Sequence, residues 1–150
     1  MNILKALIVL SLAAGGYSYW KHHHLRAQDA ASLSTGAPGP FVSLPPVDGQ
    51  RAQTVFVIAA QNCPHEAAQR ADHLAEVLSR QGIPVERTNR ANFHFTSRPD
   101  PATMDRIASV MNGPLPVVFI NGRAKSNPSL DEVASEFKQA VRSASPSATS

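Results

Sequence analysis

The order of apolar segments between residues 53 and 142 constrains the fold of this chain more than any other feature. Short apolar runs of strand length alternate with longer stretches whose apolar residues recur every three to four positions, the spacing of one helix face. The strand-length runs are Thr54–Ala60, Ile83–Asn89 and Leu115–Asn121. Because strands alternate with helices along the chain, the sequence predicts an α/β domain over residues 53–142.

Three helices are expected to follow these strands, each with its own start signal. Pro64 stands at the expected first position of the first helix, which Gly82 ends. In Asp100–Pro101, the aspartate is the expected N-cap of the second helix and the proline its first residue. Ser129 and Glu132 have the spacing of a capping box, which predicts the start of the third helix.

A hairpin is expected at Asn121-Gly122, since this dipeptide favours a tight turn between strands. Arg123–Ser126 should then return as a brief antiparallel edge strand, where the charges of Arg123 and Lys125 would deter pairing with another chain. Right-handed crossovers place the first strand centrally. The sequence therefore predicts a mixed four-stranded sheet with helices on both faces.

The flanks of this domain have a different composition. Residues 1–26 contain an uncharged run from Ala6 to Trp20, and we consider an uncleaved membrane anchor, a cleaved signal segment and a buried soluble helix for it. Residues 27–52 are rich in Ala, Ser, Pro and Gly and predict a flexible tether. Residues 143–150 predict a disordered tail.

Charge and cysteine content exclude several classes of function. The predicted domain carries ten basic and nine acidic side chains, so it lacks the basic face that binds nucleic acid. Cys63 is the single cysteine, which rules out an intramolecular disulfide and a multi-cysteine zinc site. The histidines at 22–24 are interpreted as the polar flank of the apolar segment. We therefore expect no metal and no nucleic-acid partner.

Two motifs fall on particular elements of this plan. Cys63-Pro64-His65-Glu66 joins the first strand to the first helix, and Leu115-Pro116 opens the third strand, which ends in Asn121-Gly122. Together they resemble the glutaredoxin branch of the thioredoxin superfamily, and Cys63-Pro64-His65 also resembles the active site of Dsb-type periplasmic oxidoreductases. The resemblance implies a thioredoxin/glutaredoxin-like fold, and it makes Pro116 the candidate for a cis-proline opposite Cys63.

The chemistry expected at these residues agrees with the resemblance. A thiol at a helix N-terminus faces unpaired N–H groups and the positive end of the helix dipole, which favour thiolate. Cys63 and His65 are therefore the candidate catalytic residues, and Pro64, Leu115 and Pro116 the candidate substrate-binding residues. The competing interpretation is that Cys63 is an inert, buried, small apolar residue.

Glu66 stands where the family places its second cysteine, so any exchange would use Cys63 as a monothiol. Cytosolic glutaredoxins resemble one another in a glutathione-binding lysine, where this chain has Ala60, and in a Gly-Gly pair, where it has Ser126-Asn127. No bound cofactor is expected, and glutathione is the candidate co-substrate.

The sequence thus predicts a membrane-anchored monothiol thiol–disulfide exchange protein of glutaredoxin type. Its expected partners are a thiol- or disulfide-bearing protein, or a small thiol, and the membrane through residues 1–26. The alternative is a redox-inactive adaptor with the same fold that binds a peptide or protein. A signal-like start sends the following chain across the membrane. We therefore expect a single-pass protein of the bacterial inner membrane with its domain in the periplasm, the cytoplasmic face being the alternative.

Overall fold

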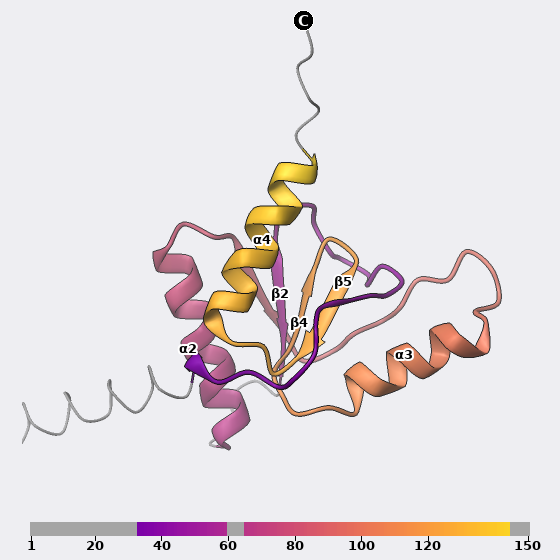
Figure 1. Cartoon of the computed structure of the whole chain (residues 1–150), viewed down its shortest axis with the longest axis horizontal. Coiled ribbons are helices and arrows are strands. Elements are labelled where there is room, and N and C mark those ends of the chain that lie inside the picture. Colours follow the sequence, from indigo (N-terminus) through magenta and orange to yellow (C-terminus); the bar gives the residue numbers. More distant parts are fainter. Residues whose placement is uncertain (1–32, 60–64, 145–150) are drawn as a thin grey trace, which may run out of the picture. The chain divides into compact units, whose positions relative to one another are not determined.

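The computed structural model describes residues 33–59 and 65–144 of the chain (Figure 1). Residues from Leu33 onward form one compact unit. Its described elements are β1 (Val42–Ser43), β2 (Val55–Ile58), α2 (Glu66–Arg80), β3 (Val85–Thr88), α3 (Pro101–Met111), β4 (Val117–Ile120), β5 (Arg123–Ser126) and α4 (Leu130–Ala144). The α/β class is confirmed. Among these elements, no helix is both long enough and apolar enough to cross a bilayer.

The described strands form one mixed sheet in the order β1-β5-β4-β2-β3. β2 runs parallel to β3 and antiparallel to β4, so it lies between these two strands as the sequence predicts. Val55 pairs with Ile120 and Ile58 with Val117. The end of β2 therefore lies beside the start of β4, at one end of the sheet.

The prediction of a four-stranded sheet with β5 at its edge is wrong. Val42 and Ser43 of β1 pair antiparallel with Ala124 and Arg123 of β5, which adds a fifth strand. The two residues of β1 belong to the stretch expected to be a tether. Because β1 covers β5, the charges of β5 do not serve as protection of an open edge.

Arg123 and Lys125 instead bind two carboxylates of α4. Arg123 Nη1 lies 3.0 Å from Glu136 Oε1, and Lys125 Nζ lies 2.5 Å from Glu132 Oε1. Residues two apart on a strand are separated by about 6.7 Å, and residues four apart on a helix by about 6 Å. The two spacings match, so both ion pairs form side by side and fix α4 along β5.

The stretch from residue 33 to residue 52 is part of the folded unit rather than a flexible tether. Leu33, Phe41, Leu44 and Val47 are each at most 6% exposed. Its prolines prevent a regular helix, but they do not prevent apolar side chains from packing on a sheet. The folded unit therefore begins before residue 53. Residues 27–32 and the expected anchor at 1–26 lie outside the described residues.

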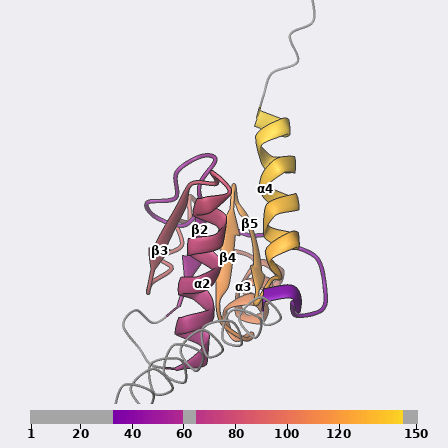
Figure 2. The ribbon, with the colours of Figure 1, turned by 90° about the vertical axis from the view of Figure 1, so that its left-hand side faces the viewer.

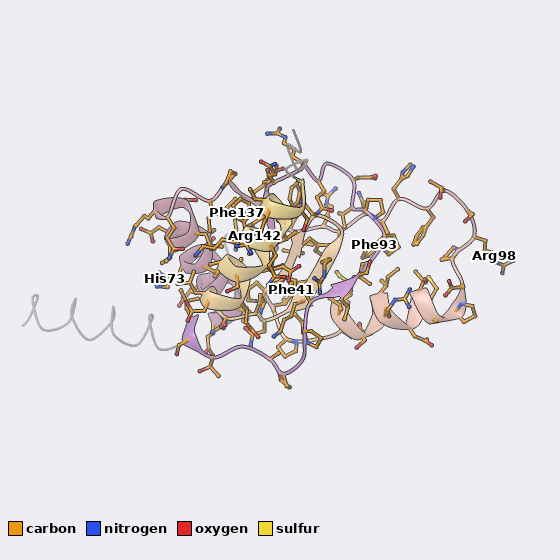
Figure 3. All side chains as sticks on the ribbon, turned by 45° about the horizontal axis from the view of Figure 1, so that its top comes forward. Phe41, His73, Phe93, Arg98, Phe137 and Arg142 are labelled. Atoms are coloured by element: carbon orange, nitrogen blue, oxygen red, sulfur yellow. The ribbon has the colours of Figure 1, made fainter. Side chains whose placement is uncertain are left out.

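Two apolar clusters lie on opposite faces of the sheet because side chains alternate along a strand. Val55 and Val57 of β2 belong to the cluster under α2 and α4, whereas Phe56 and Ile58 belong to the cluster under α3. Figure 2 shows α2 and α4 from the side, and Figure 3 labels Phe137 of the first cluster and Phe93 of the second. Helices on both faces are thus confirmed.

The predicted helix starts at Asp100 and Ser129 are confirmed. The Asp100 carboxylate accepts a 2.6 Å hydrogen bond from the Thr103 backbone N–H. At α4, the Ser129 N–H donates to Glu132 Oε2 at 2.8 Å, and the Glu132 N–H donates to Ser129 Oγ at 3.3 Å. The final helix continues to Ala144, two residues into the expected tail, whose remainder at 145–150 lies outside the described residues.

Candidate functional site

The junction between β2 and α2 carries the first sequence motif. β2 ends at Ile58, and the Ala59 N–H donates to Thr88 O at 3.1 Å. His65 is the N-cap of α2, and its carbonyl accepts hydrogen bonds from the backbone N–H groups of Ala68 and Gln69. The helix therefore begins at Glu66, two residues later than the position expected from Pro64. Cys63 and Pro64 lie outside the described residues.

His65 and Glu66 are both exposed at this helix start. The His65 backbone is extended, with φ −68° and ψ 145°, and its side chain makes no capping hydrogen bond to the helix. Glu66 supplies an acidic side chain to the first turn, where it interacts favourably with the helix dipole. The Cys63-Pro64-His65-Glu66 motif thus leads directly into the N-terminus of a fifteen-residue helix.

Leu115 and Pro116 lie at the same end of the sheet. The Leu115–Pro116 peptide bond is cis, as the resemblance implies. Continuing the register of Ile58 with Val117 places Pro116 opposite Ala59, where the chain leaves β2. Pro116 is buried, whereas Leu115 is 39% exposed. The structure therefore brings Leu115 and Pro116 to the end of the sheet at which α2 begins.

Sequence reasoning missed a contact made by Arg70, which lies in the second turn of α2. Its Nη2 donates a 2.7 Å hydrogen bond to the carbonyl of Thr35. Burial lowers the pKa of the Arg70 guanidinium, while the nearby Glu66 carboxylate acts in the opposite direction. A basic residue one turn after the motif was a signal in the sequence, but its partner lies in the stretch expected to be a tether.

The β5–α4 junction borders the same end of the sheet. The Asn127 N–H donates to Pro116 O at 2.6 Å, and Asn127 adopts a positive φ of 41°. Lys125 is only 4% exposed and binds Glu132. Burial opposes ionisation of Glu132, but hydrogen bonds from Lys125 and Ser129 outweigh it and hold the pKa of that carboxyl below its ordinary value. Lys125 and Glu132 are therefore paired with each other at this junction.

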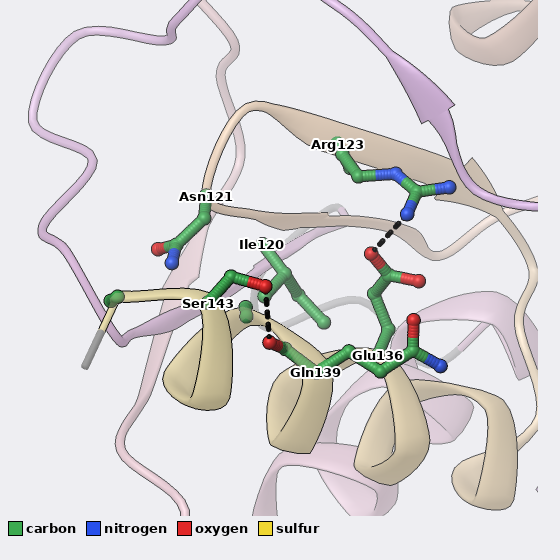
Figure 4. A pocket seen from close by; sticks show the side chains of 8 residues that line it. Ile120, Asn121, Arg123, Glu136, Gln139 and Ser143 are labelled. Atoms are coloured by element: carbon green, nitrogen blue, oxygen red, sulfur yellow. Dashed lines mark hydrogen bonds and ion pairs between the residues drawn. The ribbon is translucent and has the colours of Figure 1, made fainter. Parts of the chain in front are cut away.

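A hollow of about 350 Å³ lies at the opposite end of the sheet (Figure 4). Ile120, which lines it, pairs with Val55 at the start of β2. Figure 4 shows the Arg123–Glu136 ion pair on one side and the hydrogen bond from Ser143 Oγ to Gln139 O on the other. Since its main charges are paired and it is remote from Pro116, this hollow is not assigned to the candidate site.

A second hollow, of about 250 Å³, lies along the connection between β3 and α3. Phe95 is 40% exposed there and stacks at a tilt on Phe93, with ring centroids 6.3 Å apart. His94 Nδ1 lies 3.6 Å from Asp48 Oδ1. The hollow is lined in part by Pro45, Pro46, His94, Phe95 and Arg98. It presents an exposed aromatic ring beside two proline rings.

Within residues 33–59 and 65–144, no group of three His, Cys, Asp or Glu side chains could hold a metal ion. Comparisons with protein-family models, curated proteins and solved structures found no match to the chain. The fold class, an α/β domain with a mixed five-stranded sheet, therefore rests on the structure alone.

Proposed function

We propose that this protein is a membrane-anchored monothiol thiol–disulfide exchanger of glutaredoxin type, with a thioredoxin-like fold extended by β1. One observation carries the proposal. The end of β2, the N-terminus of α2 and the Leu115–Pro116 bond lie at one end of the sheet. Cys63 precedes the N-cap residue His65 by only two positions in the chain.

The proposed reaction is one round of thiol–disulfide exchange. The Cys63 thiolate attacks one sulfur of a substrate disulfide, a new disulfide forms between Cys63 and that sulfur, and the other sulfur leaves as a thiolate. A thiol from outside the chain then attacks the mixed disulfide and releases Cys63, because Glu66 occupies the position of a resolving cysteine. The electron count is balanced, since one disulfide is exchanged for another.

Each neighbouring residue has a proposed role in this reaction. The first N–H groups of α2 stabilise the thiolate, and His65 adds positive charge when it is protonated. Leu115 offers an exposed apolar side chain to the substrate, and Pro64 and Pro116 are the other proposed substrate-binding residues. The proposed substrates are a thiol- or disulfide-bearing protein or a small thiol, with glutathione as the candidate co-substrate.

The test is the reactivity of Cys63 in the full chain. Its alkylation by iodoacetamide should follow a pKa below the free-thiol value of about 8.5. The Cys63→Ser variant should form no mixed disulfide and should keep the circular dichroism spectrum of the wild-type chain. Slow alkylation that still rises above pH 9 would contradict the proposal.

The proposed location is the bacterial inner membrane, with the domain in the periplasm. The support is the short basic start and the apolar run from Ala6 to Trp20, which are typical of a segment that sends the following chain across a membrane. A C-terminal alkaline phosphatase fusion should be active, since this enzyme matures only after export. An inactive fusion, expressed at a normal level, would place the domain in the cytoplasm.

The second candidate is a redox-inactive adaptor that binds an extended peptide. The observation in its favour is the hollow beside Phe95, because exposed aromatic rings next to prolines suit an extended apolar ligand. The two candidates differ at Cys63: an adaptor would keep its partner in Cys63→Ser and lose it in Phe95→Ser. An exchanger would show the reverse.

A further inference from the structure

The hollow between the end of β4 and the second half of α4, which we call the β4–α4 hollow, has the size of a small-molecule site (Figure 4). Its volume of about 350 Å³ lies at the lower end of the range for ligand pockets, and it could hold one small molecule. The polar or partly exposed residues that line it include Asn121, Arg123, Glu136, Gln139, Ala140 and Ser143.

Glu136 supplies a carboxylate oxygen that is open to a ligand. The residue is only 9% exposed, and its Oε1 lies 3.0 Å from Arg123 Nη1. Within the residues that the structure describes, Arg123 is the one partner of this carboxylate, so Glu136 Oε2 receives no hydrogen bond from the protein. A carboxylate oxygen in a largely buried position gains from a donor, since it has lost most of its contact with water. Glu136 Oε2 is therefore an acceptor for a ligand in the hollow.

Arg123 balances the charge of Glu136 and is itself fixed in place. Its Nη1 pairs with Glu136, and its Nη2 donates a 2.7 Å hydrogen bond to Phe41 O. These are the two charged side chains that line the hollow, and their charges cancel. An anion or a cation entering it would lose hydration without meeting an uncompensated opposite charge. The hollow therefore suits a neutral ligand.

The other side of the hollow offers donors and acceptors together. Figure 4 shows Asn121 and Ser143 there, facing Arg123 and Glu136. Asn121 Oδ1 accepts a 3.0 Å hydrogen bond from the Gln53 N–H, which leaves the Asn121 NH₂ group as a donor. Ser143 Oγ donates to Gln139 O at 2.9 Å, so its lone pairs remain as acceptors. A hydroxyl group both donates and accepts, so neighbouring hydroxyls on one molecule match this set.

We propose that the β4–α4 hollow binds a neutral, polyhydroxylated ring, such as one hexose unit of a carbohydrate. One hydroxyl of the ring donates to Glu136 Oε2, another accepts from the Asn121 amide, and the half-buried Ala140 contacts the C–H groups of the ring. No aromatic side chain lines the described part of the hollow, so the ring has no stacking partner and binds weakly. The site is independent of thiol–disulfide exchange, because none of its residues belongs to the proposed exchange site.

The test is a titration of the ¹⁵N-labelled full chain in dodecylphosphocholine micelles, a detergent without a sugar group. The probes are two neutral glycosides, methyl α-glucoside and methyl α-galactoside, and two charged analogues, the glucuronate anion and protonated glucosamine. The side-chain NH₂ signals of Asn121 and Gln139 report binding by NMR. At least one neutral glycoside should shift both signals with a Kd on the order of 1 to 10 mM, and the charged analogues should bind on the order of tenfold more weakly.

Two variants test the named contacts, followed on the Asn121 signal. Glu136→Gln keeps the size of the side chain and should weaken binding on the order of tenfold, because a charge-assisted acceptor is lost. Gln139→Ala removes an exposed amide and should weaken it about fivefold. Lys138→Ala, an exposed neighbour on α4 outside the lining, is the matched control and should bind within about twofold of the wild type, as should Cys63→Ser.

Three results would overturn the proposal. One is the absence of a saturating shift with both neutral glycosides up to about 100 mM. Another is binding of glucuronate or glucosamine as tight as that of the neutral probes, which would make the hollow a site for an ion. The third is unchanged binding in both Glu136→Gln and Gln139→Ala. Each result leaves the proposed exchange untouched, since that function is tested by alkylation of Cys63.

Discussion

α2 and α4 pack more deeply on their face of the sheet than α3 packs on the other. Leu74 and Leu78 of α2 and Val133 of α4 are completely buried. The buried residues of α3 are Ile107 and Val110, and each is still 8% exposed. Met104 on the same helix is 47% exposed. Burial of apolar area is the main favourable term in folding, so the α2–α4 face should carry more of the stability.

This difference has a functional consequence under the proposed function. The deeply packed face supports the N-terminus of α2 and the start of α4, where Ser129 and Glu132 form the capping box. The α3 face instead borders the connection that exposes Phe95. Precise placement of reacting groups needs rigid support, whereas a surface that adapts to a peptide does not. Under the proposed function, the face under α2 and α4 is therefore the better support for the reacting groups.

The largest losses of stability are expected from truncating one buried side chain in each of the two core clusters. Leu74→Ala should lower the free energy of unfolding by about 4 kcal/mol, and Ile107→Ala by about 2 kcal/mol, because the second side chain is less buried and its surroundings can collapse more easily. Urea unfolding of the full chain measures both. Equal losses at the two sites would show that the faces do not differ in energetic weight.

A smaller effect is expected at the ion pair between Lys125 and Glu132. Glu132→Gln leaves the buried Lys125 ammonium without its counter-charge and should cost about 2 kcal/mol, below the range for fully buried pairs because Glu132 is 40% exposed. Lys125→Met removes the buried charge and should cost less than about 1 kcal/mol. A larger loss in Lys125→Met would mean that the ammonium stabilises α4 beyond its pairing with Glu132.

The same pair predicts a pH dependence. The folded-state pKa of Glu132 lies below its ordinary value of 4.5, so its contribution is complete above that value and disappears as the pH falls through the lower, folded-state pKa. The stability difference between the wild type and Glu132→Gln should therefore shrink between neutral pH and acid. Urea midpoints at a series of pH values measure it, and a constant difference would exclude the linkage.

The smallest effects are expected at the helix starts on the two faces. Ser129→Ala should cost about 1 kcal/mol, since the buried capping box of α4 loses its hydroxyl. Asp100→Ala should cost less, because the cap of α3 is exposed to solvent. The Thr103 N–H lowers the pKa of Asp100, so this loss should be present at neutral pH and vanish in acid. Thermal unfolding measures both, with the exposed Asp105→Ala as control.

The local elements could be predicted from the sequence because their signals lie within a few residues of one another. The caps of α3 and α4, the turn at Asn121-Gly122 and the strands around Val57 and Val118 depend on side-chain spacing along a short segment. The start of α2 was displaced by two residues, since a proline is tolerated both at the first helical position and just before the N-cap.

The role of residues 33–52 could not be predicted in this way. Val42 pairs with Ala124, and Phe41 O accepts a hydrogen bond from Arg123 Nη2, so these two partners lie some 80 residues further along the chain. Composition alone predicts a tether here, because proline and glycine lower the propensity for every regular element. The apolar residues among the prolines were the available signal, but they have no helix or strand period.

The amino-acid sequence by itself determined the order of strands and helices, the position of the cysteine before a helix, and the presence of only one cysteine in the chain. These are properties of neighbouring residues and of composition. Only the tertiary structure decided that Arg123 and Lys125 bind α4, that Gly36 closes on Ser129 and that Arg70 binds Thr35. Each of these contacts joins two different elements of the fold, so it depends on how helices, strands and the stretch from residue 33 to 40 pack together rather than on a pattern within one element.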